Sequence, residues 1–145
     1  MASVVVRRVL SMSELRWLAL ALLALTVAFG AAVARAEPLP EAEVVAVVRQ
    51  AFPPRELARA VTVARCESTF DPAAVSAGYD RRLGVWYDHR GLFQIEANVW
   101  HWLAENIARA LRHSVVDLFD AETNAHVAAA VLRIQGWSAW PWCGR

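Results

Sequence analysis

Hydrophobic residues recur at helical spacing in four segments of the chain, with polar residues in the positions between them. The segments cover residues 41–52, 55–66, 96–112 and a last stretch between Asp120 and Gly136. Pro53-Pro54 separates the first two, because proline ends one helix and fits the first turn of the next. Asp120 is a suitable N-cap and Gly136 a suitable helix end. The residues predicted to face the core are Val44, Val47, Val48, Ala51, Leu57, Val61, Ala64, Trp100, Leu103, Ile107, Ala110, Leu111, Val127, Val131 and Ile134.

The helical pattern is lost between residues 68 and 92. This stretch contains Asp71-Pro72 and three glycines, which favour turns. It is predicted to be a long loop that includes a short hairpin near Val85-Trp86-Tyr87. The sequence therefore predicts an all-α, mainly helical fold with one long loop.

The first 36 residues have the pattern of a secretory leader. Arg7, Arg8 and Arg16 come first, the uncharged apolar run 17–34 follows, and Ala34-Arg35-Ala36 has the small residues of a cleavage site. We expect a signal peptide over residues 1–36 and a secreted domain over 37–145, extracellular or periplasmic. The alternative is an uncleaved membrane anchor, because the apolar run is near the lower length limit for crossing a bilayer.

The remaining 109 residues suffice for one small domain with one core. Without the four arginines and one glutamate of the leader, 11 Arg face 13 Asp and Glu, a net charge of −2. No basic stripe is present, which argues against a nucleic-acid partner. The four histidines (His89, His101, His113 and His126) form no metal pattern, and no Gly-rich phosphate loop occurs. We expect no cofactor and no metal.

Glu67 occupies a position where the helical pattern calls for an apolar residue. One turn earlier lie Val63 and Ala64, and two turns earlier lies Ala60. A carboxyl held on that stripe is partly desolvated, which raises its pKa and suits a proton donor near neutral pH. Glu67 is therefore a candidate general acid. The alternative is a helix-end glutamate that simply points to water.

Two cysteines, Cys66 and Cys143, lie in the part expected to be exported. An even count in a small exported domain favours a disulfide, which would join the end of the chain to the helix that carries Glu67. Closing a loop of about 78 residues would stabilise the fold by roughly 4.5 kcal/mol at most. The alternatives are two free thiols or a metal site, and the latter lacks a histidine at ligand spacing.

Three separated stretches combine into a family pattern. They are Glu67-Ser68 with residues 69–76, then Gly91-Leu92-Phe93-Gln94-Ile95, then residues 117–125 with Asn124. In this order they resemble the lysozyme-like lytic transglycosylases, in the domain related to goose-type lysozyme. That family has a Glu-Ser at a helix end, a Gly-Leu-Met/Phe-Gln segment and an Asn that opens a later core helix. The resemblance covers about residues 44–143 and implies a lysozyme-like helical domain with a long active-site loop.

The resemblance implies an enzyme that cleaves the β-1,4 bond between N-acetylmuramic acid and N-acetylglucosamine in peptidoglycan glycan strands. Glu67 would act as acid and base and leave 1,6-anhydromuramic ends. A hydrolytic lysozyme acting on the same bond is the alternative, and a second carboxylate would favour it. Asp80, Asp88 and Glu96 are the candidates for that carboxylate.

Four more residues match family positions near the acid and are expected to bind substrate. Ser68 and Gln94 would support the site and contact sugar, with capping and backbone support as the alternative. Gly91 would allow a close approach of backbone to ligand or a special turn. Asn124 has a second reading as a residue that satisfies local hydrogen bonds at a helix start.

The chain departs from the commoner family pattern in two places. The loop over residues 77–90 is longer and aromatic, and the Ala-Tyr-Asn-Ala-Gly segment after the last core helix is replaced by a Trp-rich ending. Tryptophan and tyrosine rings can stack on sugars, so Trp137 and Trp140 are expected to bind substrate, with Trp86 and Tyr87 as further candidates. The alternative for these rings is core packing.

Two other classes of protein compete with the enzyme. One is a non-catalytic secreted peptidoglycan-binding domain, and the other is a secreted interaction protein that uses its aromatic loop against a partner. The presence of Glu67 favours the enzyme. We expect a monomer that contacts a membrane only through an uncleaved leader.

Overall fold

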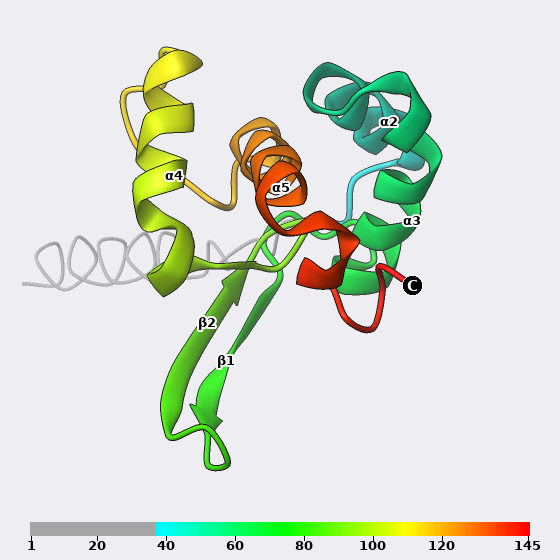
Figure 1. Cartoon of the computed structure of the whole chain (residues 1–145). Helices are drawn as coiled ribbons and strands as arrows, with labels where there is room; N and C mark the ends of the chain where they lie inside the picture. Colours follow the sequence, from blue (N-terminus) through cyan, green and yellow to red (C-terminus); the bar gives the residue numbers. More distant parts are fainter. Residues whose placement is uncertain (1–36) are drawn as a thin grey trace, which may run out of the picture. The chain divides into compact units, whose positions relative to one another are not determined.

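The computed structural model describes residues 37–145 (Figure 1). In chain order its elements are α2 (Glu41–Ala51), the 3₁₀ turn η1 (Pro54–Glu56), α3 (Leu57–Ser68), β1 (Val75–Asp80), β2 (Val85–Arg90), β3 (Ile95–Glu96), α4 (Ala97–Ala110), α5 (Ala121–Gln135) and the 3₁₀ turn η2 (Gly136–Ala139). The expected leader over residues 1–36 lies outside the described residues. Within residues 37–145, every helix is too short or too polar to cross a bilayer.

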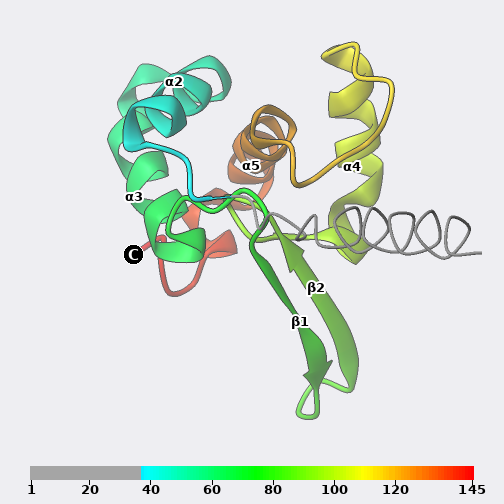
Figure 2. The same ribbon diagram turned by 180° about the vertical axis from the view of Figure 1, so that it is seen from behind.

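Helix α5 is the central element of the helical part. It lies between α4 on one side and α2 with α3 on the other (Figures 1 and 2). Eight of its residues are buried, including an uninterrupted run from Val127 to Val131. A helix that is buried around most of its circumference must lie inside the fold. The core that surrounds it includes Val44, Val48, Val63, Leu92, Phe93 and Trp140.

The four predicted helices are confirmed, with ends within about two residues of the expected positions. Asp120 caps α5, because its carboxylate accepts a hydrogen bond from the Thr123 backbone N–H at 2.7 Å. Gly136 ends that helix with φ of 68°. Two predicted core residues are wrong: Ile134 is 56% exposed and Ala110 is also exposed. Both lie in the last turn of a helix, where neighbouring elements no longer cover the apolar stripe.

The long loop predicted for residues 68–92 is wrong over about half of its length, where the chain forms a hairpin that is longer than the short one expected near Val85-Trp86-Tyr87. Strands β1 and β2 pair antiparallel over six residues each, and β2 also pairs with the short β3. Asp80 shapes the turn, since its carboxylate accepts hydrogen bonds from the backbone N–H groups of Arg82 and Leu83. Gly84 supplies the positive φ of 69° that the turn needs. Over residues 37–145, the fold thus consists of four α-helices and a small three-stranded sheet.

The hairpin of β1 and β2 projects from the helical part, away from α2, α4 and α5 (Figures 1 and 2). Its large side chains are consequently exposed, with Trp86 at 74% and Tyr79 at 49%. These two rings pack against each other across the strands, with centroids 5.2 Å apart. The sheet is therefore not a layer of the core.

The predicted disulfide is present between Cys66 and Cys143, whose Cα atoms are 5.7 Å apart. It fastens the end of the chain to the last turn of α3. Trp140, in the same C-terminal segment, donates its indole N–H to the Phe93 carbonyl at 2.8 Å. Together these contacts hold the Trp-rich ending between α3 and the Phe93 segment.

Candidate active site

Glu67 lies in the last turn of α3, on the side of the helix that packs into the core. Ala60, Val63 and Ala64 precede it at helical spacing and are fully buried. Glu67 itself is only partly exposed. Its side chain therefore continues the buried stripe, as the spacing predicts.

Burial raises the pKa of the Glu67 carboxyl above its ordinary value. The cause of the raised pKa is desolvation, and within residues 37–145 no cation or hydrogen bond counteracts it by stabilising the carboxylate. The nearest arginine in sequence, Arg65, forms an ion pair with Glu41 at 2.6 Å instead. The proton of Glu67 is thus retained to higher pH, which is what a general acid needs.

The chain turns sharply directly after Glu67 and Ser68. Thr69 and Phe70 have φ of 54° and 67°, a left-handed conformation that costs roughly 1–2 kcal/mol per residue for side chains other than glycine. The Thr69 N–H donates to the Arg65 carbonyl at 2.9 Å and closes the helix. The Ser68 hydroxyl donates to the Ala64 carbonyl at 3.0 Å, which fits the capping and backbone support expected as the alternative to sugar contact. A strained, well-bonded turn of this kind fixes the direction of the last helical side chains.

Gln94 is a third residue with positive φ, at 47°. Its side-chain amide donates to the carbonyls of Ala74 and Gly91, both at 3.1 Å. Ala74 precedes β1 on the segment that comes from α3, so Gln94 links the chain after Glu67 to the chain before β3. The end of α3, the base of the hairpin and η2 lie next to one another in both ribbon views (Figures 1 and 2). Sugar contact by Gln94 stays a prediction.

Asn124 was expected to bind substrate, but the structure places it in the core. It is fully buried, and its side chain accepts from the Phe93 N–H at 2.9 Å. Its amide donates to the Leu118 and Arg90 carbonyls at 2.8 and 2.9 Å. This burial leaves no surface of Asn124 for direct contact with a glycan. Its role is hydrogen bonding within the protein, as the alternative expected, but only the bond to Leu118 is local and the other two join Asn124 to the segment before β3.

Gly91 packs closely against the same buried amide. A Cβ at this position would lie 2.2 Å from the Leu118 carbonyl oxygen and 2.3 Å from Asn124 Nδ2. Its φ of 74° also disfavours any other residue. Of its two expected roles, the special turn is the one that the structure shows.

The two tryptophans expected to bind substrate are packed by neighbours. Trp140 is 4% exposed and contacts Phe93 edge-on, so it has no free face for a sugar. Trp137 is partly exposed, stacks on Phe52 and donates its indole N–H to Glu56 at 3.0 Å. Arg59 covers the Trp137 ring at 5.1 Å from its centroid. Core packing accounts for Trp140, and sugar binding by Trp137 stays a prediction.

The three candidate second carboxylates have different surroundings. Asp80 is used by the hairpin turn. Asp88 forms a two-pronged hydrogen bond with the Arg90 guanidinium, which lowers the pKa of Asp88 and keeps it ionised. Glu96 caps α4 through the Asn98 N–H at 3.0 Å and also accepts from the Asp88 N–H at 2.9 Å.

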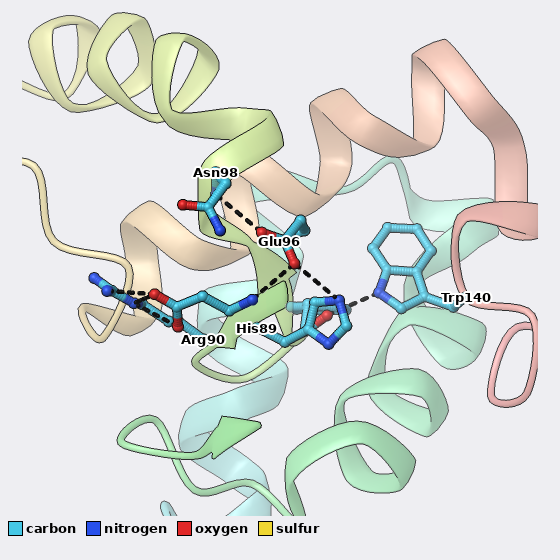
Figure 3. Close-up of polar contacts among 7 residues, drawn as sticks. His89, Arg90, Glu96, Asn98 and Trp140 are labelled. Carbon is cyan, nitrogen blue, oxygen red and sulfur yellow. Dashed lines mark hydrogen bonds and ion pairs between the residues drawn. The ribbon is translucent and has the colours of Figure 1, made fainter. Parts of the chain in front are cut away.

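Glu96 also contacts His89, with Nε2 and Oε2 3.3 Å apart. In Figure 3 His89 points toward Glu96 on the side of Trp140, whereas Arg90, the next residue, points the other way. A small pocket of about 70 Å³ opens here, and its lining includes His89, Gln94, Glu96, Trp100, Gln135 and Trp140. The pocket therefore connects Gln94 with His89 and Glu96 of the sheet.

Sequence reasoning missed the position of His89, which was considered only as a metal ligand. The position of His89 can be predicted only when the register of the hairpin is known, because the register decides which of the two faces of a strand each side chain lies on. The polar and aromatic residues at positions 87 and 89 have the required spacing of two. That signal was hidden because the segment was read as a loop.

The arrangement provides one partly desolvated acid, Glu67, at the end of α3, and a small polar pocket lined by Gln94, His89 and Glu96. Among residues 37–145, no cluster of three His, Cys, Asp or Glu could hold a metal ion. The chemistry that these side chains can supply is proton donation and proton removal by a single carboxyl group.

A comparison with protein families matches the transglycosylase SLT domain to residues 45–136, more than half of the chain. No curated protein and no solved structure matches the chain significantly. The matched span contains Glu67, Gly91, Gln94 and Asn124. The chain therefore belongs to the transglycosylase SLT domain family.

Proposed function

We propose that the protein is a lytic transglycosylase that cleaves the β-1,4 bond between N-acetylmuramic acid and N-acetylglucosamine, with Glu67 as its acid and base. Membership of the family supports an action on peptidoglycan in general. The observation that carries the finer proposal is the place of Glu67: at the family's acid position, on the buried side of α3, with a pKa raised by burial.

The reaction needs one proton carrier. Protonated Glu67 donates its proton to the glycosidic oxygen, and the bond from that oxygen to C1 of the muramic acid breaks. The substrate's N-acetyl group helps to stabilise the positive charge at C1. The Glu67 carboxylate then removes the proton from the C6 hydroxyl as its oxygen bonds to C1. This closes the 1,6-anhydro ring, consumes no water and returns Glu67 to its starting state.

Hydrolysis by a lysozyme-type mechanism is the second candidate, and Glu96 is the observation in its favour. Its carboxylate lines the pocket that also contains Gln94. In that mechanism water replaces the C6 hydroxyl, and a second carboxylate assists. The two candidates differ in product, because anhydro ends are lighter by one water than hydrolysed ends.

The test is digestion of purified peptidoglycan followed by mass spectrometry of the released muropeptides. We expect anhydro ends from the wild type and none from Glu67→Gln, which keeps the size of the side chain but carries no transferable carboxyl proton. Glu105→Gln, on an exposed part of α4, is the matched control and should cleave like the wild type. Substantial cleavage by a well-folded Glu67→Gln protein would refute the assignment.

We also propose that the domain works after export, with residues 1–36 removed as a signal peptide. The Cys66–Cys143 disulfide supports this, since such bonds persist mainly in oxidising compartments. The intact mass of the exported protein tests it: we expect a chain that begins at Glu37, and a full-length chain would favour the anchor.

A further inference from the structure

The two faces of the hairpin lead to different parts of the molecule. Register places Ser76 opposite His89 and Gly78 opposite Tyr87, and the next pair, Tyr79 and Trp86, projects to the other face. The face of Trp86 continues to Asp88 and Arg90, whose guanidinium lies over Phe119. The face of Tyr87 continues to His89 and Glu96 and so reaches the pocket that contains Gln94.

The side chains on the Tyr87 face are held in place by one another. The rings of Tyr87 and His89 stack with centroids 5.4 Å apart and planes 29° apart. His89 is fixed in turn by Glu96, which the backbone N–H groups of Asp88 and Asn98 hold from two sides. The result is a continuous row of Tyr87, His89 and Glu96 leading to the pocket (Figure 3 shows its His89 end).

Gly78 lets the Tyr87 ring lie across the neighbouring strand. A Cβ at Gly78 would be 2.8 Å from the Tyr87 hydroxyl oxygen and 3.0 Å from its Cζ atom. Any larger residue would push the ring away from the sheet. One side of the ring therefore packs on the strand, and Tyr87 remains partly exposed to solvent.

We propose that Tyr87 and His89 form a glycan-binding surface that extends the pocket at Gln94 along the hairpin. The inference rests on the proposed function, because the ligand is an N-acetylated glycan strand of peptidoglycan. Flat rings with polar edges suit it, since a pyranose ring stacks on an aromatic face while its hydroxyl and acetamido groups hydrogen-bond at the rim. Glu96 and the exposed imidazole edge supply such hydrogen-bonding groups.

The experiment compares neighbouring residues that lie on opposite faces. Binding of chitooligosaccharides is measured by calorimetry, and turnover on peptidoglycan by muropeptide release. Tyr87→Ala should bind about fivefold to tenfold more weakly, with a higher KM and an unchanged kcat, because the ring does not touch the reacting atoms. Gly78→Ala should have the same effect by displacing the ring. Trp86→Ala should match the wild type, and Tyr87→Phe should keep most of the affinity.

Folding of each variant is checked by circular dichroism and thermal melting. If the wild type cleaves peptidoglycan and Tyr87→Ala binds and cleaves equally well, this inference is wrong and the proposed function stands. Loss of binding in Trp86→Ala alone would place the glycan on the other face and also overturn it. A wild type that neither binds nor cleaves would overturn both proposals.

Discussion

At the scale of single residues, Glu67 couples chemistry to stability. Its pKa is raised by burial, so the folded state holds this proton more tightly than the unfolded chain does. Stability from this group is complete below the unfolded pKa and is lost as pH rises through the folded pKa. Glu67→Gln carries no charge to desolvate. We therefore expect the variant to melt at a higher temperature than the wild type at neutral pH and at the same temperature in acid.

The same titration controls the rate. Because the protonated form is the donor, cleavage by the wild type should fall as pH rises through the pKa of Glu67. Turnover is measured from pH 5 to 9, alongside melting curves that confirm folding. A flat rate profile, or a Glu67→Gln protein less stable than the wild type at neutral pH, would count against a partly desolvated catalytic acid.

Gly91 and Gly136 make a matched pair for a second prediction. Both have positive φ, at 74° and 68°. A Cβ at Gly91 would collide with the Leu118 carbonyl and the Asn124 amide, whereas one at Gly136 would meet nothing within 4 Å. Gly136 has ψ of −169°, a conformation that is essentially restricted to glycine, so Gly136→Ala should cost about 1–3 kcal/mol through backbone strain alone. Gly91→Ala should cost several times more or prevent folding, and chemical denaturation measures both. Equal effects would show that Gly91 serves backbone conformation alone.

At the scale of elements, the helices could be predicted because their apolar residues recur at helical spacing, on one face in α2, α3 and α4 and around most of the circumference in α5. Val44 and Val48 in α2, and Val127 and Val131 in α5, are four residues apart and lie on the same buried face of their helix. The hairpin could not be predicted in the same way, since it projects from the core and its strands have no buried face. Trp86 and Tyr87 are neighbours in β2 and lie on opposite faces of the hairpin. Because neither face is buried, the hydrophobic pattern of the sequence does not tell the two faces apart.

The candidate site was predictable to the extent that it follows from helix geometry. The half-buried place of Glu67 follows from the residues one and two turns earlier. The burial of Asn124 and Trp140 does not, because most of their partners are backbone groups at residues 90 and 93, more than 30 positions away in the sequence. Polar and aromatic residues that satisfy distant backbone groups look like ligand-binding residues until the tertiary contacts are known.

At the scale of the whole molecule, the Cys66–Cys143 bond closes a loop that includes nearly all of the site. Adjacent helical residues point about 100° apart, so Cys66 fastens the C-terminal segment on a different side of α3 from Glu67. The bond restricts the unfolded chain over 77 residues, and its removal should cost about 2–4 kcal/mol. Cys143→Ser should therefore lower the melting temperature markedly and leave turnover at low temperature almost unchanged.

Reduction supplies the matched control for this prediction. Dithiothreitol should destabilise the wild type but leave the melting temperature of the Cys66→Ser, Cys143→Ser double variant unchanged, since that chain has no bond to break. Mass spectrometry of the exported wild type should find no free thiol. Two free thiols, or a Cys143→Ser protein that melts with the wild type, would mean that the helix packing and the Trp140–Phe93 hydrogen bond hold the C-terminal segment without covalent help.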